Sequence, residues 1–170
     1  TDLSGRVTTV SDTIVLTTCA NATQLPSTYQ ATCWKYQQVA QGSGGGFEAT
    51  TFDDTAWATG QGAFGSSGGC AVANNGSIHT AWATNTDLLV RRHIEMAPGA
   101  TGVQVWLTID NDITAIYWNG VQIGGPSSHE NCANPDDRVF AVSPGLIIAD
   151  NVLAIRARDR GSEAYFDARV

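Results

Sequence analysis

Residues 107–120 constrain the fold of this chain more than any other segment. They read LTIDNDITAIYWNG, which predicts a strand, a corner made of Asp and Asn, a second strand, and a turn at Asn119 and Gly120. Asn-Gly between two apolar runs is the strongest short-range signal for a β-hairpin, because both residues tolerate the positive φ angles of a type I′ turn. The segment therefore predicts antiparallel β-structure.

Further strands follow the same pattern over the rest of the chain. We find no window with the 3.6-residue period of an amphipathic helix, and we interpret the Gly-rich stretch 58–85 as long surface loops. Short strands separated by turn residues at this spacing are typical of an all-β sandwich. Apolar runs bounded by Gly, Pro, Asn or Asp predict these strands at 88–96, 103–110, 114–118, 121–123, 139–142 and 152–158.

Alternation of side chains along a strand predicts which residues reach the core. In the strand that begins at residue 103, the residues that should face inward are Val103, Val105, Leu107 and Ile109. Those that should face outward are Gln104, Trp106 and Thr108. Trp106 is therefore a candidate for an exposed aromatic side chain.

The composition limits the partners of the chain. It has 170 residues, nine of them basic, and a formal net charge of −7. The length suits one domain, which we divide into an N-terminal strand or extension over 1–33 and a β-sandwich over 34–170. Because phosphate binding needs clustered cations, we expect neither nucleic acid nor an anionic membrane surface as partner. The apolar runs are too short for membrane insertion, and the first residues lack the pattern of a signal peptide.

The four cysteines are Cys19, Cys33, Cys70 and Cys132, and none belongs to a CxxC pair of the kind that binds zinc. Of the three pairings that four cysteines allow, we favour Cys19 with Cys33 and Cys70 with Cys132. The alternative is four reduced thiols. Two disulfides would point to an oxidising compartment, so we expect the protein to be extracellular or on the surface of a virion or cell.

Four segments in order resemble the galactose-binding-like jelly-roll domains, which occur attached to glycoside hydrolases and in surface and phage tail proteins. The segments are 52–65 (FDDTAWATGQGAFG), 86–96, 107–120 and 151–170. The resemblance covers most of the chain after residue 33. It implies an antiparallel jelly-roll sandwich, often with a structural calcium ion, that binds ligands through long loops at one end.

A carbohydrate site needs an aromatic plate for the C–H face of the sugar ring and planar polar groups for its hydroxyls. We expect Trp34, Trp57 and Trp118 in the core, whereas Trp82, in a polar loop, and Trp106, on an outer strand face, are candidate plates. Plain solvent exposure is the alternative for every candidate. The candidate hydroxyl partners are His129, Glu130, Asn131, Asp136, Asp137 and Arg138.

Clusters of acidic residues suggest a metal site or catalysis. Calcium takes six to eight oxygen ligands, which Asp110, Asn111 and Asp112 could supply, as could the turn at Asp53 and Asp54. A solvated turn is the alternative at both places. A glycosidase also needs two carboxylates, but Asp in tight corners usually hydrogen-bonds its own backbone, and in the resembling domains the Asp pair before the tryptophan is a structural turn. We therefore expect no enzyme.

Two hypotheses for function follow. The first is a non-catalytic, lectin-like extracellular module that binds a glycan or cell-surface polysaccharide. The alternative is a structural protein of a virion or surface assembly, such as a capsid decoration or a tail component, that uses the sandwich as a docking unit. Its partners would be other assembly proteins or further copies of the same chain.

Overall fold

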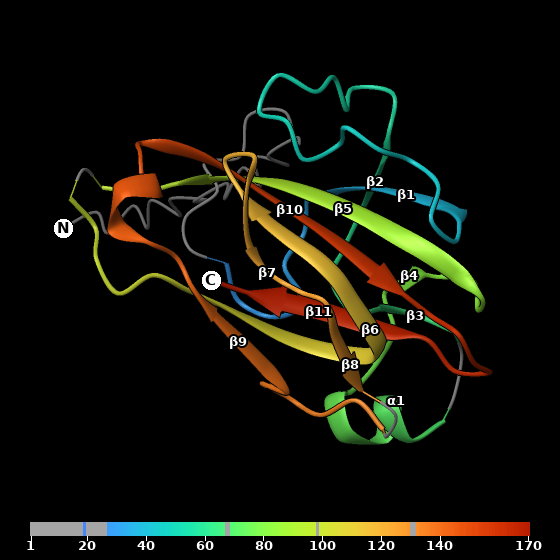
Figure 1. Ribbon diagram of the computed structural model, residues 1–170. Helices are drawn as coiled ribbons and strands as arrows, with labels where there is room; N and C mark the ends of the chain where they lie inside the picture. The colour runs from blue at the N-terminus through green and yellow to red at the C-terminus, as the bar shows by residue number, and fades with distance from the viewer. Residues whose placement is uncertain (1–18, 20–26, 67–68, 98, 130–131) are drawn as a thin grey trace, which may run out of the picture.

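The computed structural model describes residues 19, 27–66, 69–97, 99–129 and 132–170 and shows a mostly β protein (Figure 1). Most of the predicted N-terminal extension, 1–33, lies outside the described residues. The elements in chain order are β1 (Trp34–Ala40), β2 (Ala58–Gly60), β3 (Phe64–Gly65), α1 (Gly69–Asn75), β4 (Thr80–Ala81), β5 (Thr86–Glu95), β6 (Gln104–Trp118), β7 (Val121–Gly124), β8 (Ser127–His129), β9 (Arg138–Ala141), the short 3₁₀ helix η2 (Pro144–Leu146), β10 (Asp150–Arg158) and β11 (Tyr165–Arg169).

The strands form one strongly curved sheet in the order β2-β1-β5-β10-β6-β11-β3-β4, and β7, β8 and β9 also pair with β6. Within the described residues every pairing is antiparallel except that of β3 with β4. The prediction of a mostly β fold is confirmed, with one short α-helix among these elements. The sheet is mixed and nearly closed like a barrel, and the two-layer jelly-roll sandwich is not specifically shown.

Side chains bring the two ends of this sheet together. The amide Nε2 of Gln38 in β1 donates to the backbone oxygen of Ala81 at 2.8 Å, and its Oε1 accepts from the backbone nitrogen of Ala83 at 2.9 Å. Thr80 in β4 adds a second link, because its hydroxyl accepts from the backbone nitrogen of Gln61 and donates to the backbone oxygen of the same residue. Side-chain hydrogen bonds therefore close the barrel where the described strands form no ladder.

The longest strand, β6, carries the sheet around the molecule. Its first half, 104–110, pairs with β9 and β11, and its second half, 111–118, pairs with β7, β8 and β10. The predicted corner is thus the point where the partner strands change, but the prediction of two separate strands is wrong. The strand continues because Asp110 still pairs with β11 while Asn111 already pairs with β8.

The predicted hairpin turn between β6 and β7 is confirmed. Asn119 and Gly120 have φ angles of 52° and 80°, the left-handed values that a type I′ turn needs. The turn places Val121 opposite Trp118 at the start of β7.

A buried amide supports this turn from the start of β10. Asn151 is fully buried, and its Oδ1 accepts from the indole nitrogen of Trp118 at 3.1 Å, the side-chain amide of Asn119 at 3.0 Å and the backbone nitrogen of Ile148 at 2.9 Å. Its Nδ2 donates to the backbone oxygens of Ile94 at 3.1 Å and Ile148 at 2.7 Å. One side chain therefore satisfies polar groups of four residues.

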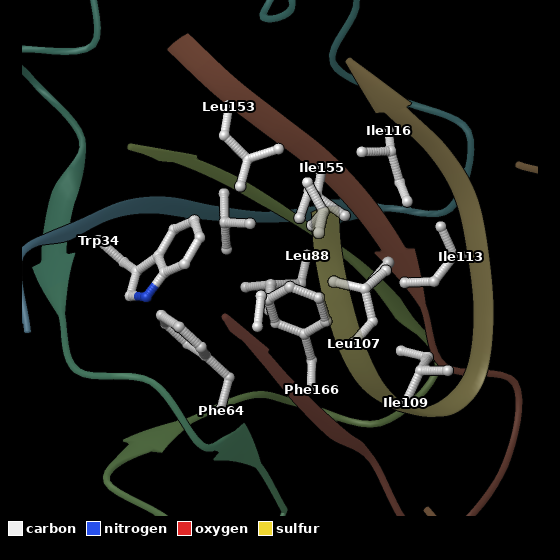
Figure 2. Close-up of a cluster of buried hydrophobic side chains, with 14 of the residues drawn as sticks. Trp34, Phe64, Leu88, Leu107, Ile109, Ile113, Ile116, Leu153, Ile155 and Phe166 are labelled. Carbon is white, nitrogen blue, oxygen red and sulfur yellow. The ribbon is translucent and has the colours of Figure 1, made fainter. Parts of the chain in front are cut away.

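The core lies inside the curve of the sheet and agrees with the predicted alternation. Val105, Leu107 and Ile109 of β6 are fully buried, as are Leu153 and Ile155 of β10. Figure 2 shows the labelled aliphatic side chains of β6 and β10 pointing into one cluster, with aromatic side chains beside them. The fully buried aromatic residues of this cluster are Trp34, Phe64, Trp118 and Phe166.

Residues 58–85 contain short strands and the helix α1, so their interpretation as surface loops is wrong. Phe64 is fully buried and Trp82 is only 1% exposed. The glycines here permit close approach of backbone segments, since a Cβ atom at Gly65 would lie 2.5 Å from the backbone oxygen of Ala164. Glycine residues that are typical of loops therefore allow tight packing of the backbone in this segment.

The segment between β1 and β2 covers the outer face of β5 and β10. Phe47 packs against both strands, and Arg91, which is 1% exposed, donates from Nε to Asp54 at 2.7 Å. Asp53 accepts a hydrogen bond from the backbone nitrogen two residues further on, at 3.0 Å. The Asp pair is therefore a structural turn, as predicted. Trp57, expected in the core, lies half-buried against Phe47 in a smaller cluster outside it.

Two disulfides connect the cysteines in the favoured pairing. Cys19 is bonded to Cys33, and Cys70 in α1 is bonded to Cys132, 62 residues away in the sequence. Disulfides are typical of proteins in oxidising, extracellular or periplasmic environments. Along the described part of the chain, no helix is long and apolar enough to cross a membrane.

Candidate functional site

Trp106 lies on the outer face of β6. Residues directly opposite each other in antiparallel strands point to the same face, and Trp106 lies opposite Val139 of β9 and Arg169 of β11. The guanidinium carbon of Arg169 is 4.6 Å from the centroid of the indole ring. Trp106 is half-buried and Val139 is 46% exposed. The predicted outward orientation of Trp106 is therefore confirmed.

Asp136 and Tyr29 hold Arg169 in place. Nε and Nη2 of Arg169 donate to the two carboxylate oxygens of Asp136 at 3.0 and 3.1 Å, and the Tyr29 hydroxyl donates to Asp136 at 2.7 Å. Hydrogen bonds from Arg169 and Tyr29 lower the pKa of Asp136, and burial raises the pKa of Tyr29 to about 12. At neutral pH the carboxylate is therefore ionised, the phenol is protonated, and the charge of Arg169 is compensated.

Beside Trp106 the surface is hollowed into a groove of about 540 Å³. Its walls come from the end of β5, the connection at 100–103, the start of β6 and Val170. This end of the sheet lies at the left in Figure 1, away from α1. We call it the Trp106 groove. It is lined chiefly by Glu95, Met96, Val103, Gln104, Trp106 and Val170.

The groove combines an apolar wall with a few planar polar groups. Its volume is in the range of small-molecule sites, which are mostly apolar with a small number of placed polar groups. Met96, Val103 and Trp106 supply apolar surface, while the Glu95 carboxylate and the Gln104 amide supply hydrogen-bonding groups. This set can bind a small, partly apolar molecule that carries hydroxyl groups.

Trp82, the other candidate plate, does not contribute to a surface site. It is 1% exposed, and its indole nitrogen donates to the hydroxyl of Thr86 at 3.0 Å. The prediction that Trp82 is accessible is wrong, because the polar segment around it folds onto the core, where its backbone nitrogen donates to Gly65 at 2.8 Å.

Most of the predicted hydroxyl partners brace the connection between β8 and β9. His129 Nε2 lies 3.2 Å from the backbone oxygen of Cys132 and 3.7 Å from the carboxylate of Asp137. Arg138 donates from Nε to the hydroxyl of Ser127 and from Nη2 to the backbone oxygen of Ser128, both at 2.7 Å. Glu130 and Asn131 lie outside the described residues. Of the described candidates in this connection, only Asp136 reaches the surroundings of Trp106.

The predicted calcium ligands are engaged with other groups. Both carboxylate oxygens of Asp112 accept from Arg160, at 2.7 and 2.9 Å. The Asn111 Oδ1 atom accepts from the backbone nitrogen of Arg160 at 2.7 Å, and the Asn111 amide donates to Asp110 at 2.6 Å. Calcium ligands must point their oxygens at one centre, so these three residues do not fit the ion. In the part of the chain that the structure describes, no group of three His, Cys, Asp or Glu residues could hold a metal ion.

Sequence reasoning missed the residues that accompany Trp106. Arg169 and Tyr29 lie 63 and 77 positions from it in the sequence, and only the pairing of β6 with β11 brings Arg169 onto the indole. Alternation along β11 predicts that Arg169 and Asp167 lie on the same face of that strand. No local sequence signal identifies β6 as the strand that pairs with β11. The sequence pattern identifies Glu95 and Met96 only as the end of a predicted strand.

No protein-family model matches the chain, and no curated protein matches it significantly. Among solved structures, the chain is similar to Bacteroides uniformis β-glucuronidase 2 covalently bound to cyclophellitol-6-carboxylate aziridine, with a TM-score of 0.51 at 16% identity. The match covers 84% of this chain and 18% of that chain. The chain therefore spans less than a fifth of the protein that it matches.

Two further structures give weaker matches. One is a glycosyl hydrolase family 2 member from Bacteroides cellulosilyticus, with a TM-score of 0.48 at 12% identity; the match covers 84% of this chain and 20% of that chain. The other is a calcium-binding mutant of the B. uniformis enzyme, with a TM-score of 0.46 at 16% identity; the match covers 85% of this chain and 18% of that chain. At these identities the likeness concerns the fold. The match to the β-glucuronidase shows a fold shared with one part of that enzyme, and to that extent the resemblance found in the sequence is confirmed.

Proposed function

We propose that this chain is a non-catalytic carbohydrate-binding domain whose ligand lies in the Trp106 groove. The observation that carries the proposal is the position of Trp106, half-exposed beside a mainly apolar groove and oriented by Arg169 and Asp136. Stacking the C–H face of a pyranose on an indole removes apolar surface of both partners from water. Trp106 and Arg169 stand on the regular strands β6 and β11, so little order has to be gained on binding.

The polar groups of the groove suit hydroxyl groups. The Glu95 carboxylate accepts hydrogen bonds, and the Gln104 amide both donates and accepts. A sugar hydroxyl also does both, so neighbouring hydroxyls of one ring can satisfy these two side chains together. Such bonds fix the orientation of a ring that the indole holds by apolar contact.

The fold supports a carbohydrate-related context. The solved β-glucuronidase matches this chain over one portion of its length, and we propose that the barrel described here corresponds to a jelly-roll domain of the kind found beside glycosidase catalytic domains. The two disulfides favour action outside the cytosol. We propose a glycan or cell-surface polysaccharide as the partner.

The same region supports binding better than hydrolysis. A glycosidase needs two carboxyl groups across one bond, one of which is usually a buried proton donor. Glu95 is exposed, and Asp150, its register partner in β10, has a side chain that is 64% exposed and lies 3.1 Å from His93. Neither carboxyl has the buried setting of a general acid.

A glycan array followed by calorimetry tests the proposal. We expect Trp106→Ala to weaken binding of the best glycan at least about tenfold, equivalent to about 1.4 kcal/mol, and Trp106→Phe to weaken it less. Val121→Ala, at an exposed residue of β7, is the surface control and should bind like the wild type. Absence of binding at millimolar glycan, or equal binding by Trp106→Ala, contradicts the proposal, and release of sugar during the assay contradicts its non-catalytic part.

The docking hypothesis remains an alternative. It is favoured by Val139, an exposed aliphatic side chain directly beside Trp106, since apolar and aromatic residues together are also typical of protein interfaces. Light scattering separates the two functions. A stable oligomer that dissociates in Trp106→Ala and Val139→Ser variants would support docking through this face.

A further inference from the structure

We infer that the Trp106 groove binds uncharged pyranose units in preference to uronic acids and other anionic sugars. The inference rests on the proposed function. It is drawn from the charged groups of the groove and of the recess of about 450 Å³ next to it, which is lined by Glu95, Met96, Ala97, Ala149 and Asp150. The ionisable side chains that line these two hollows are Glu95 and Asp150, both carboxylates.

The two carboxylates are close to each other because of the strand register. Glu95 ends β5 and Asp150 begins β10, and the two residues lie directly opposite in this antiparallel pair. Side chains of such a pair point to the same face. They therefore form one local region of negative charge at the end of the groove.

The basic side chains near the groove already face carboxylates. Arg169, which stacks on Trp106, donates two hydrogen bonds to Asp136. His93 lies 3.1 Å from Asp150, and its side chain is 54% exposed to solvent. Carboxylates of the protein therefore already compensate part of the positive charge that could attract an anionic sugar.

Hydrogen-bond chemistry favours the same ligands. A carboxylate only accepts hydrogen bonds, so Glu95 can bind the hydroxyl of an uncharged sugar but offers nothing to a second carboxylate. Two like charges at contact distance in a solvent-exposed site repel each other enough to weaken binding about fivefold. The repulsion should be largely screened at 1 M salt, where the Debye length is about 3 Å.

An array of hexose oligosaccharides, each paired with the same oligosaccharide oxidised at C6 to the uronic acid, tests this inference. For every neutral glycan that binds, we expect the oxidised form to bind about fivefold more weakly at low salt. Glu95→Gln and 1 M salt should each reduce that difference. Glu48→Gln, at a half-buried residue of the segment between β1 and β2, is the matched control and should leave the difference unchanged.

The outcomes distinguish this inference from the proposed function. Equal or tighter binding of the oxidised glycans overturns the inference and leaves carbohydrate binding intact. Weaker binding that Glu95→Gln does not relieve overturns the role of the carboxylates. If neither member of any pair binds, the proposed function and the inference both fail.

Discussion

The buried carboxyl of Asp167 should make the protein less stable as the pH rises from about 4 to about 6. Asp167 lies in β11 and is 2% exposed. Its two oxygens accept hydrogen bonds from the backbone nitrogens of Gln30 and Ala168, each at 2.8 Å. Burial outweighs these bonds and raises the pKa of Asp167 from the ordinary 3.8 to about 6.

The sign follows from the direction of this change. A carboxyl whose pKa is higher in the folded state binds its proton more tightly there, so its contribution to stability is present below about pH 3.8 and is lost as the pH rises through about 6. At about 1.4 kcal/mol for each pKa unit, the loss is about 3 kcal/mol. Asp159, whose pKa burial also raises, acts in the same direction. Hydrogen bonds lower the pKa values of Asp53 and Asp136. The stability that these two carboxylates contribute is lost as the pH falls below about 4, so they change little between pH 4 and 6.

Urea unfolding between pH 4.0 and 6.5 measures the effect. Ionisation of Asp167 should cost the wild type about 2 kcal/mol across this range, because the rest of the loss falls outside it, and Asp167→Asn should lose clearly less, although it is less stable at every pH. Asp53→Asn, at an exposed turn, is the control and should follow the wild type. Parallel curves for the wild type and Asp167→Asn would refute the reasoning, as would a carboxyl resonance of Asp167 that titrates below pH 4 in the wild type.

Three other changes test the packing. Asp54→Ala removes the carboxylate beside Arg91, which is 1% exposed, and should cost about 3 kcal/mol in urea unfolding because a buried charge loses its partner; a loss below about 1 kcal/mol would contradict this. Asn151→Ala should cost at least about 3 kcal/mol, since polar groups of four residues lose a partner, and unchanged stability would show that water replaces the amide. A Cys70→Ser, Cys132→Ser variant should lose about 4 kcal/mol because the bond closes a loop of 62 residues, and an unchanged melting temperature would argue against that.

Most strands could be predicted from the sequence because their signals are local. Alternation identified the buried side of β6, with Leu107 and Ile109 in the core, and Asn119-Gly120 identified its turn. The continuity of β6 could not be predicted. Asp110 and Asn111 have the composition of a turn, and what keeps them extended is pairing with β11 and β8, which are far away in the sequence.

The candidate site shows the same division between local and distant information. The outward position of Trp106 follows from alternation within one strand. Its contact with Arg169 depends on the register of two strands, and the accessibility of Trp82 depends on how a polar segment folds back over the core. Composition suggested exposure for Trp82 because its neighbours are polar, but those neighbours form the outer layer above it.

The position of the Trp106 groove also has a consequence for specificity. At the other end of the sheet, the connection after β8 is braced by its own hydrogen bonds and by the Cys70–Cys132 bond. The groove instead has strands on one side, fixed by the barrel, and the connection at 100–103 on the other. Because this connection forms no strand ladder among the described residues, substitutions in it can reshape the groove while β5 and β6 keep their pairing. Discrimination among uncharged sugars should therefore depend on 100–103, whereas affinity for all of them should depend on Trp106.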